Sequence, residues 1–133
     1  VTTQGIEVNI ISQLMDNLTG KLGYTYLDTE DEKTGKELTN RPKHKLDLEL
    51  NWRIAEFGLN LNLSGQYVGR RYEDKENTIR LGGYTVLDFA LTKDITKYGE
   101  IFFRLDNITG KKHVPDEYDI DGIEFLGGVK INF

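Results

Sequence analysis

Two arginines and a tyrosine, Arg70, Arg71 and Tyr72, stand side by side at the start of a polar segment, residues 69–83. Guanidinium groups donate charge-assisted hydrogen bonds to oxyanions, and a neighbouring tyrosine adds a flat ring for a ligand to rest on. The segment carries four basic and three acidic residues, so its net charge is +1. We therefore predict a site for an anionic ligand at these three residues. The alternative is a solubilising loop beside an interfacial tyrosine.

Two other polar segments are acidic. Residues 28–37 and residues 107–124 each carry five carboxylates and two lysines, which gives each segment a net charge of −3. The run Asp116, Glu117, Asp119 and Asp121 offers the oxygen ligands that Ca²⁺ prefers, but it lacks the spacing and the central glycine of an EF-hand loop. Solvated acidic loops are the favoured interpretation, and Ca²⁺ binding stays open. No metal site is predicted.

Catalysis has little support in the residue types present. The chain has no cysteine, two histidines (His44 and His113) and two serines (Ser12 and Ser64). The serines lie inside alternating segments without the signature of a catalytic nucleophile. The formal net charge of −5 disfavours a nucleic-acid surface. We predict that the chain is not an enzyme, holds no cofactor and binds no nucleic acid.

The elements that must position these residues are strands, because apolar and polar residues alternate with a period of two. From Lys45 to Arg53 the alternation is perfect over nine residues. A helix would scatter the leucines of that segment around its circumference. Seven such segments are predicted, at residues 5–14, 18–27, 45–53, 59–67, 84–95, 100–108 and 123–133. Most have about 9–11 residues, the length that a tilted strand needs to cross a bilayer.

The connections between these strands alternate between short turns and long polar loops. The long ones are residues 28–43, 69–83 and 107–122. In an antiparallel sheet this places the turns at one end and the loops at the other, as in outer-membrane barrels. Seven strands cannot close into an all-antiparallel barrel, so we expect the chain to be part of a larger one. An intact small barrel would need an eighth strand.

Two environments could give each strand one apolar and one polar face. In a membrane barrel the apolar face meets lipid and the polar face lines the lumen. In a soluble, lipocalin-like barrel that binds a small apolar ligand, the apolar face points inward. Aromatic residues gather near the strand ends, as in the two aromatic belts of a membrane barrel. The predicted fold class is therefore all-β, an antiparallel meander of about seven long strands that forms a partial transmembrane β-barrel.

Three charged residues are expected to share the polar face of neighbouring strands. Arg104 and Asp106 stand two residues apart on one predicted strand, and Asp88 on the strand before it could pair with Arg104. We predict a network in the lumen wall that holds the strands in register. The alternative is three independently hydrated side chains.

Four short motifs follow one another along the chain, LTNRPKHKL (38–46), GYTVLD (83–88), RLDNI (104–108) and GGVKINF (127–133). Together they resemble the last strands of the 22-stranded barrel of TonB-dependent outer-membrane receptors. One departure is Asn107-Ile108-Thr109-Gly110, where the family usually has Asn-Leu-Phe-Asp.

The resemblance implies that residues 1–133 are the C-terminal segment of such a barrel, with the plug domain and the earlier strands outside it. It implies a bacterial outer-membrane location and a receptor for a scarce nutrient such as an iron–siderophore complex or cobalamin. The implied partners are outer-membrane lipid, a ligand such as a ferric siderophore, and the TonB energy-coupling protein, reached only through the plug. It also marks Val129, Ile131 and Phe133 as the terminal signal that the barrel-assembly machinery recognises.

Overall fold

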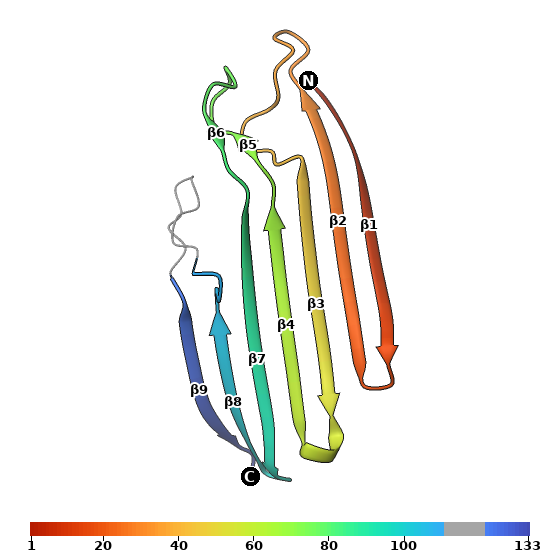
Figure 1. The fold of residues 1–133 in the computed structure, drawn as a ribbon, viewed down its shortest axis with the longest axis vertical. Coiled ribbons are helices and arrows are strands. Elements are labelled where there is room, and N and C mark those ends of the chain that lie inside the picture. Colours follow the sequence, from red (N-terminus) through yellow and green to blue (C-terminus); the bar gives the residue numbers. More distant parts are fainter. Residues whose placement is uncertain (111–121) are drawn as a thin grey trace.

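The fold is a single antiparallel sheet of seven long strands (Figure 1), seen in a computed structural model that describes residues 1–110 and 122–133. The order across the sheet is β1-β2-β3-β4-β7-β8-β9. The strands are β1 (Thr2–Met15), β2 (Leu18–Glu30), β3 (His44–Ile54), β4 (Leu59–Val68), β7 (Tyr84–Thr96), β8 (Gly99–Asp106) and β9 (Glu124–Ile131). Each pairs with the next along this order, so the predicted meander is confirmed.

Two small elements were not predicted. The segment between β4 and β7 contains a short hairpin of β5 (Arg71–Tyr72) and β6 (Arg80–Leu81). The turn between β3 and β4 contains a single 3-10 turn, η1 (Ala55–Phe57), which ends at Gly58 in the left-handed conformation, with φ +59°. Among the described residues, no helix is long and apolar enough to span a membrane.

The strand register gathers the apolar residues on one face of the sheet. Leu50 on β3 lies opposite Leu63 on β4, and Leu63 lies opposite Phe89 on β7. The row continues to Leu105 on β8 and Phe125 on β9. Because successive side chains of a strand point to opposite faces, the charged and amide side chains between these positions form the other face.

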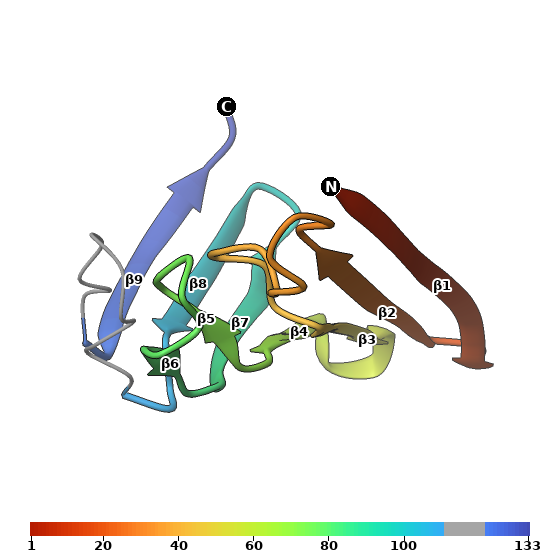
Figure 2. The same ribbon diagram turned by 90° about the horizontal axis from the view of Figure 1, so that it is seen from above.

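The sheet is bent into an arc, and the polar face is its concave side. Figure 2 shows the curvature from the loop end, with β1 and β9 at the two open edges. A groove of about 720 Å³ on the concave side is lined by polar side chains that include Lys21, Asp47, Glu49 and Ser64. The apolar row described above therefore lies on the convex side.

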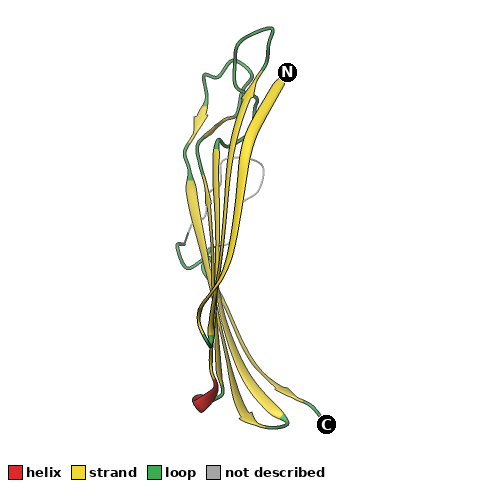
Figure 3. Cartoon of the chain, turned by 90° about the vertical axis from the view of Figure 1, so that its right-hand side faces the viewer, coloured by secondary structure: helices red, strands yellow, loops and turns green. Residues whose placement is uncertain are grey.

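The described part of the chain has almost no hydrophobic core. Within the described residues, the buried apolar side chains are Val68 and Leu81, at 5% and 6% exposure. By contrast, Leu46 and Phe103 in the middle strands are each 37% exposed. Figure 3 shows a single layer of strands with no second layer against it. The apolar face is thus open to its surroundings, whereas a lipocalin-like barrel would enclose it.

Short turns lie at one end of the sheet and longer connections at the other (Figure 1). The turn end holds the β1–β2, β3–β4 and β7–β8 connections, and the loop end holds segments 31–43 and 69–83. This is the predicted asymmetry. It places Arg70, Arg71 and Tyr72 at the loop end, at the mouth of the arc.

Candidate functional site: the loop mouth

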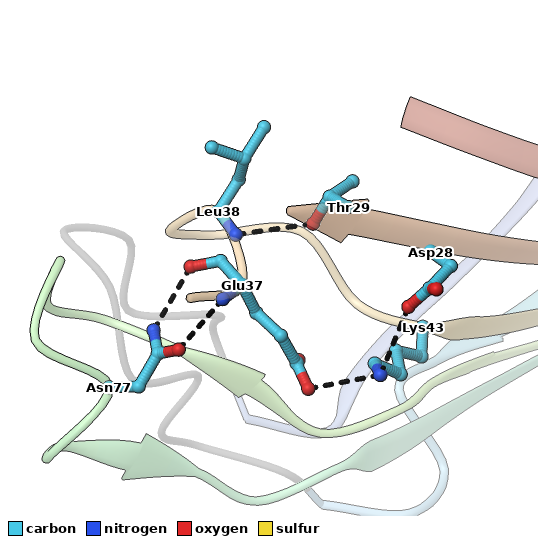
Figure 4. A network of polar contacts seen from close by, with 6 residues as sticks. All are labelled: Asp28, Thr29, Glu37, Leu38, Lys43 and Asn77. Atoms are coloured by element: carbon cyan, nitrogen blue, oxygen red, sulfur yellow. Dashed lines mark hydrogen bonds and ion pairs between the residues drawn. The ribbon is translucent and has the colours of Figure 1, made fainter. Parts of the chain in front are cut away.

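Segments 31–43 and 69–83 are joined by a pair of hydrogen bonds through Asn77. The backbone N–H of Glu37 donates to Oδ1 of Asn77 at 2.8 Å, and Nδ2 of Asn77 donates to the carbonyl of Glu37 at 3.0 Å (Figure 4). Asn77 sits in the left-handed region, at φ +58°, which asparagine tolerates better than most residues. A third bond runs from the N–H of Asn40 to the carbonyl of Tyr72 at 2.7 Å. We call these contacts the loop clamp.

Lys43 fixes the base of the first segment. Its Nζ lies 3.1 Å from a carboxylate oxygen of Asp28 and 3.0 Å from one of Glu37 (Figure 4). The hydrogen bonds that Lys43 donates to Glu37 and Asp28 raise its pKa. Beside it, the N–H of Leu38 donates to the hydroxyl of the buried Thr29 at 3.2 Å. Two acids of the predicted acidic segment therefore share one lysine, which leaves the three side chains with a net charge of −1.

Asp74 organises the tip of the second segment. Its carboxylate accepts hydrogen bonds from the hydroxyl of Thr78 at 2.7 Å and from the N–H groups of Thr78 and Ile79 at 2.9 and 2.7 Å. Desolvation raises the pKa of Asp74, but these hydrogen bonds outweigh it and lower the pKa to about 2. The turn that places Asn77 opposite Glu37 is thus held by an ionised carboxylate.

The three predicted ligand residues do not form one exposed cluster. Arg70 is exposed, and Tyr72 is half-buried on β5. Arg71 is 6% exposed, and its guanidinium carbon lies 5.9 Å from the ring centre of Tyr84. Within this geometry Arg71 packs beneath the mouth, and Arg70 is the exposed guanidinium of the three.

The other acidic residues have varied settings. Asp31 closes a turn, since its carbonyl accepts the N–H of Gly35 at 2.7 Å and its carboxylate accepts the N–H of Lys33 at 2.9 Å. Among the described residues, no three metal-ligating side chains come together. The acidic run from Asp116 to Asp121 lies outside the described residues.

The predicted network on the polar face is only partly assembled. Arg104 holds Asp106 of its own strand in a bidentate contact, with nitrogen–oxygen distances of 2.6–3.1 Å. Asp88 lines the same depression as these two residues, but its carboxylate accepts the backbone N–H of Asn107 at 2.7 Å. Asn107 is 4% exposed and has φ +53°. Asp88 therefore secures the end of β8 through the backbone, a role that the alternation did not reveal.

The terminal residues named as an assembly signal lie at the open edge strand. Val129, Ile131 and Phe133 are 61%, 59% and 114% exposed. Val129 pairs with Ile101, and Ile131 pairs with Gly99, which places both on the apolar face. The geometry is that of an exposed, alternating edge strand.

The loop clamp was missed by sequence reasoning. Glu37 and Asn77 are forty residues apart, and no local pattern links them. The spacing Asp74–Thr78, in which a short acid can bond to backbone groups ahead of it, was the available signal for the turn. The left-handed asparagines could not be identified without coordinates.

Long strands with one largely apolar face that no protein layer covers, a polar concave face, and turns and loops sorted to opposite ends define the class of transmembrane β-barrel proteins. A more particular assignment follows from comparison with known proteins. Residues 1–108 match the family model "TonB dependent receptor-like, beta-barrel", and the chain belongs to this family. Its members are bacterial outer-membrane proteins.

Curated relatives include nutrient receptors. The chain is 28% identical over 129 residues to the ferrioxamine receptor of Yersinia enterocolitica, a match that covers 89% of this chain and 18% of that protein. It is 24% identical over 133 residues to the ferrichrome outer membrane transporter/phage receptor of Escherichia coli K12, covering 92% of this chain and 18% of the relative. The chain thus spans less than a fifth of the length of these relatives.

Solved structures share the fold over nearly the whole chain. The siderophore receptor PiuA from Acinetobacter baumannii superposes with a TM-score of 0.82 at 20% identity, over 97% of this chain and 21% of that one. The ferric yersiniabactin uptake receptor FyuA from Yersinia pestis gives 0.78 at 19% identity, over 98% and 23%. The sheet therefore has the fold of one part of a receptor barrel.

Proposed function

We propose that this chain forms the last strands and part of the extracellular mouth of an outer-membrane receptor for energy-coupled uptake of a scarce nutrient. The nutrient is an iron–siderophore complex or a compound of the cobalamin class. The relatives named as ferrioxamine, ferrichrome and vitamin B12 transporters support this choice of ligand. In this proposal residues 1–133 are one segment of a larger barrel, with the plug domain and the earlier strands supplied by the rest of the receptor.

The observation that carries the proposal is the two-faced sheet. An apolar convex face that is one-third or more exposed at Leu46 and Phe103 has no protein layer against it. In hydrocarbon, exposing apolar side chains carries no free-energy penalty. The polar concave face suits a water-filled or plugged lumen. Outer-membrane lipid is accordingly the first partner.

Two further partners follow from the proposed receptor. The exposed terminal strand suits recognition by the barrel-assembly machinery through edge pairing, with pockets for Val129, Ile131 and Phe133. The TonB protein would act through the plug and not through these strands. The polar-face group of Asp88, Arg104 and Asp106 would stand in the lumen wall and hold the strand ends in register.

At the mouth, Arg70 and Tyr72 are proposed to contact the ligand, with Arg71 supporting them from below. A ferric siderophore offers anionic oxygens to a guanidinium and flat groups to a ring. The loop clamp would hold segment 69–83 in a fixed position, which lowers the ordering cost of binding.

The test is uptake by the complete receptor that carries this chain, expressed in a strain lacking its own ferric-siderophore and cobalamin receptors. Radiolabelled ferrioxamine, ferrichrome and cobalamin are supplied one at a time. Uptake of one of them, abolished by collapsing the proton gradient, supports the proposal. The variant Arg70→Gln should weaken ligand binding, and the matched variant Lys45→Gln on the wall should not. A folded, membrane-inserted receptor that binds none of the three classes would refute the proposed ligand chemistry.

A further inference from the structure

We propose that the turn end of the sheet carries a binding site for the phosphate headgroup of an anionic phospholipid, built from Lys93 and Lys97 with Phe57 and Tyr98. The inference rests on the proposed function, because it requires the convex face to lie in a bilayer. Short turns mark the periplasmic side of an outer-membrane barrel, so the lipid is one of the periplasmic leaflet.

Two neighbouring hairpin turns form the site. The N–H of Asp94 on β7 donates to the carbonyl of Gly58 at 2.8 Å, which joins the β3–β4 turn to the strand that leads into the β7–β8 turn. Phe57 belongs to the first turn, and Lys97 and Tyr98 form the tip of the second. Groups from both turns thus lie along one stretch of the sheet's lower rim.

Lys93 stands where an apolar residue is expected. It lies opposite Leu59 on β4 and Ile101 on β8, so its side chain belongs to the apolar, convex face of the sheet. Its ammonium group reaches down to donate a hydrogen bond to the carbonyl of Phe57. A lysine on a lipid-facing row extends its charge toward the headgroups while its stem stays in the apolar layer.

Two of the acids near this rim are already paired with other residues. Asp94 forms an ion pair with Arg53 at 3.2 Å, and Glu100 lies 3.9 Å from Lys130. Both acids are on the polar face. Across the part of the chain that the structure describes, no ion pair includes Lys93 or Lys97. Glu56 is the exposed acid of the β3–β4 turn.

Each ammonium group lies beside an aromatic residue, because Lys93 donates to the carbonyl of Phe57 and Lys97 lies against the ring of Tyr98. Trp52, Phe57 and Tyr98 are 40%, 59% and 55% exposed. The ammonium of Lys97 lies 4.8 Å from the ring centre of Tyr98, which holds the charge close to a ring suited to headgroup depth. Two cations beside interfacial aromatic residues match an anionic headgroup, and a zwitterionic headgroup would bring its own cation against them.

The experiment measures lipid retention on the complete receptor, purified in detergent and titrated with phosphatidylglycerol or phosphatidylcholine under native mass spectrometry. The test variant is Lys93→Gln with Lys97→Gln. The matched control is Lys21→Gln with Lys45→Gln, which removes the same charge from the polar face. Each membrane-surface cation strengthens binding to anionic lipid about five-fold, so the test variant should lose about 5- to 25-fold in phosphatidylglycerol affinity. Phosphatidylcholine binding and the control should not change.

Equal phosphatidylglycerol affinity in the two double variants would overturn the site. So would displacement of the lipid by an equimolar amount of inorganic phosphate, which would indicate a site for the free anion. If the test variant fails to fold, Lys93→Arg with Lys97→Arg must retain binding. The unmodified receptor must also lose its preference for phosphatidylglycerol at high salt. Failure of the lipid site leaves nutrient uptake intact, whereas a receptor that does not enter bilayers refutes the proposed function itself.

Discussion

Arginine placed at successive depths on β4 tests whether the convex face meets lipid. Leu59, Leu61 and Leu63 follow one another along β4 on the apolar face, and Leu63 is in the middle of the strand. At the bilayer midplane an arginine costs about 2–4 kcal/mol, and near the interface about 0–1 kcal/mol. Leu59 stands opposite Lys93, at a level where the protein already carries a cation. We therefore expect the cost to rise from Leu59→Arg through Leu61→Arg to Leu63→Arg.

The midplane cost of about 2–4 kcal/mol, expected for Leu63→Arg, corresponds to a roughly 30- to 700-fold change in the folding equilibrium. Each arginine variant of the complete receptor is unfolded with guanidinium chloride in phospholipid vesicles, and the midpoint and slope give the free energy of unfolding. The matched control is Asn62→Arg, which stands between Asn51 and Ala90 on the polar face and should be nearly neutral. A flat profile along the row, or an equal cost for Asn62→Arg and Leu63→Arg, would show that the convex face does not meet lipid.

Three further outcomes are expected. Asn77→Ala removes two hydrogen bonds to the facing loop, worth about 1–3 kcal/mol together, and should speed hydrogen exchange in that loop; an unchanged rate would contradict the clamp. Because the pKa of Asp74 is lowered from 3.8 to about 2, its contribution is complete above about pH 4 and is lost as the pH falls through about 2. Exchange in its turn, measured between pH 2 and 5, should follow that curve, and Asp74→Asn should abolish it. A Cβ at Gly128 would meet the Phe102 ring at 2.6 Å, whereas at Gly127 the nearest atom is 3.6 Å away. Gly128→Ala should therefore displace the Phe102 ring and lower stability in a denaturant titration, and Gly127→Ala should lower it clearly less.

The seven long strands, which form the wall of the barrel, could be predicted from the sequence because each strand shows its own alternation of apolar and polar residues. A strand with one face in hydrocarbon needs an apolar residue at every second position, and that requirement is met strand by strand. The alternation from Lys45 to Arg53 therefore gave both the strand and its faces, and the register of β3 against β4 confirms them. The extra length of β1 and β2, which reach Thr2 and Glu30, was underestimated because their ends leave the alternating pattern.

The mouth could not be predicted in the same way, because its contacts join residues far apart in the sequence. The bond between Glu37 and Asn77 depends on two loops meeting above the strands, and composition described the first loop only as acidic. Arg71 looked like its neighbour Arg70 in the sequence, yet the short hairpin turns it under the mouth toward Tyr84. Asp88 was placed on the correct face, but its partner is a backbone N–H that the side-chain pattern does not show.

The contrast between wall and mouth sets different rules for substitution. In the proposed bilayer the neighbour of the convex face is a fluid that adapts to shape, so hydropathy and depth decide the cost of a change at Leu61 or Leu63. At the mouth the neighbour is another loop with fixed donors and acceptors, so a change as small as Asn77→Asp, which leaves the N–H of Glu37 a partner but gives its carbonyl none, acts through geometry. Selection for a new ligand can therefore alter the loops while the strands keep only their alternation. A family in which 20% identity accompanies the same fold is what such rules produce.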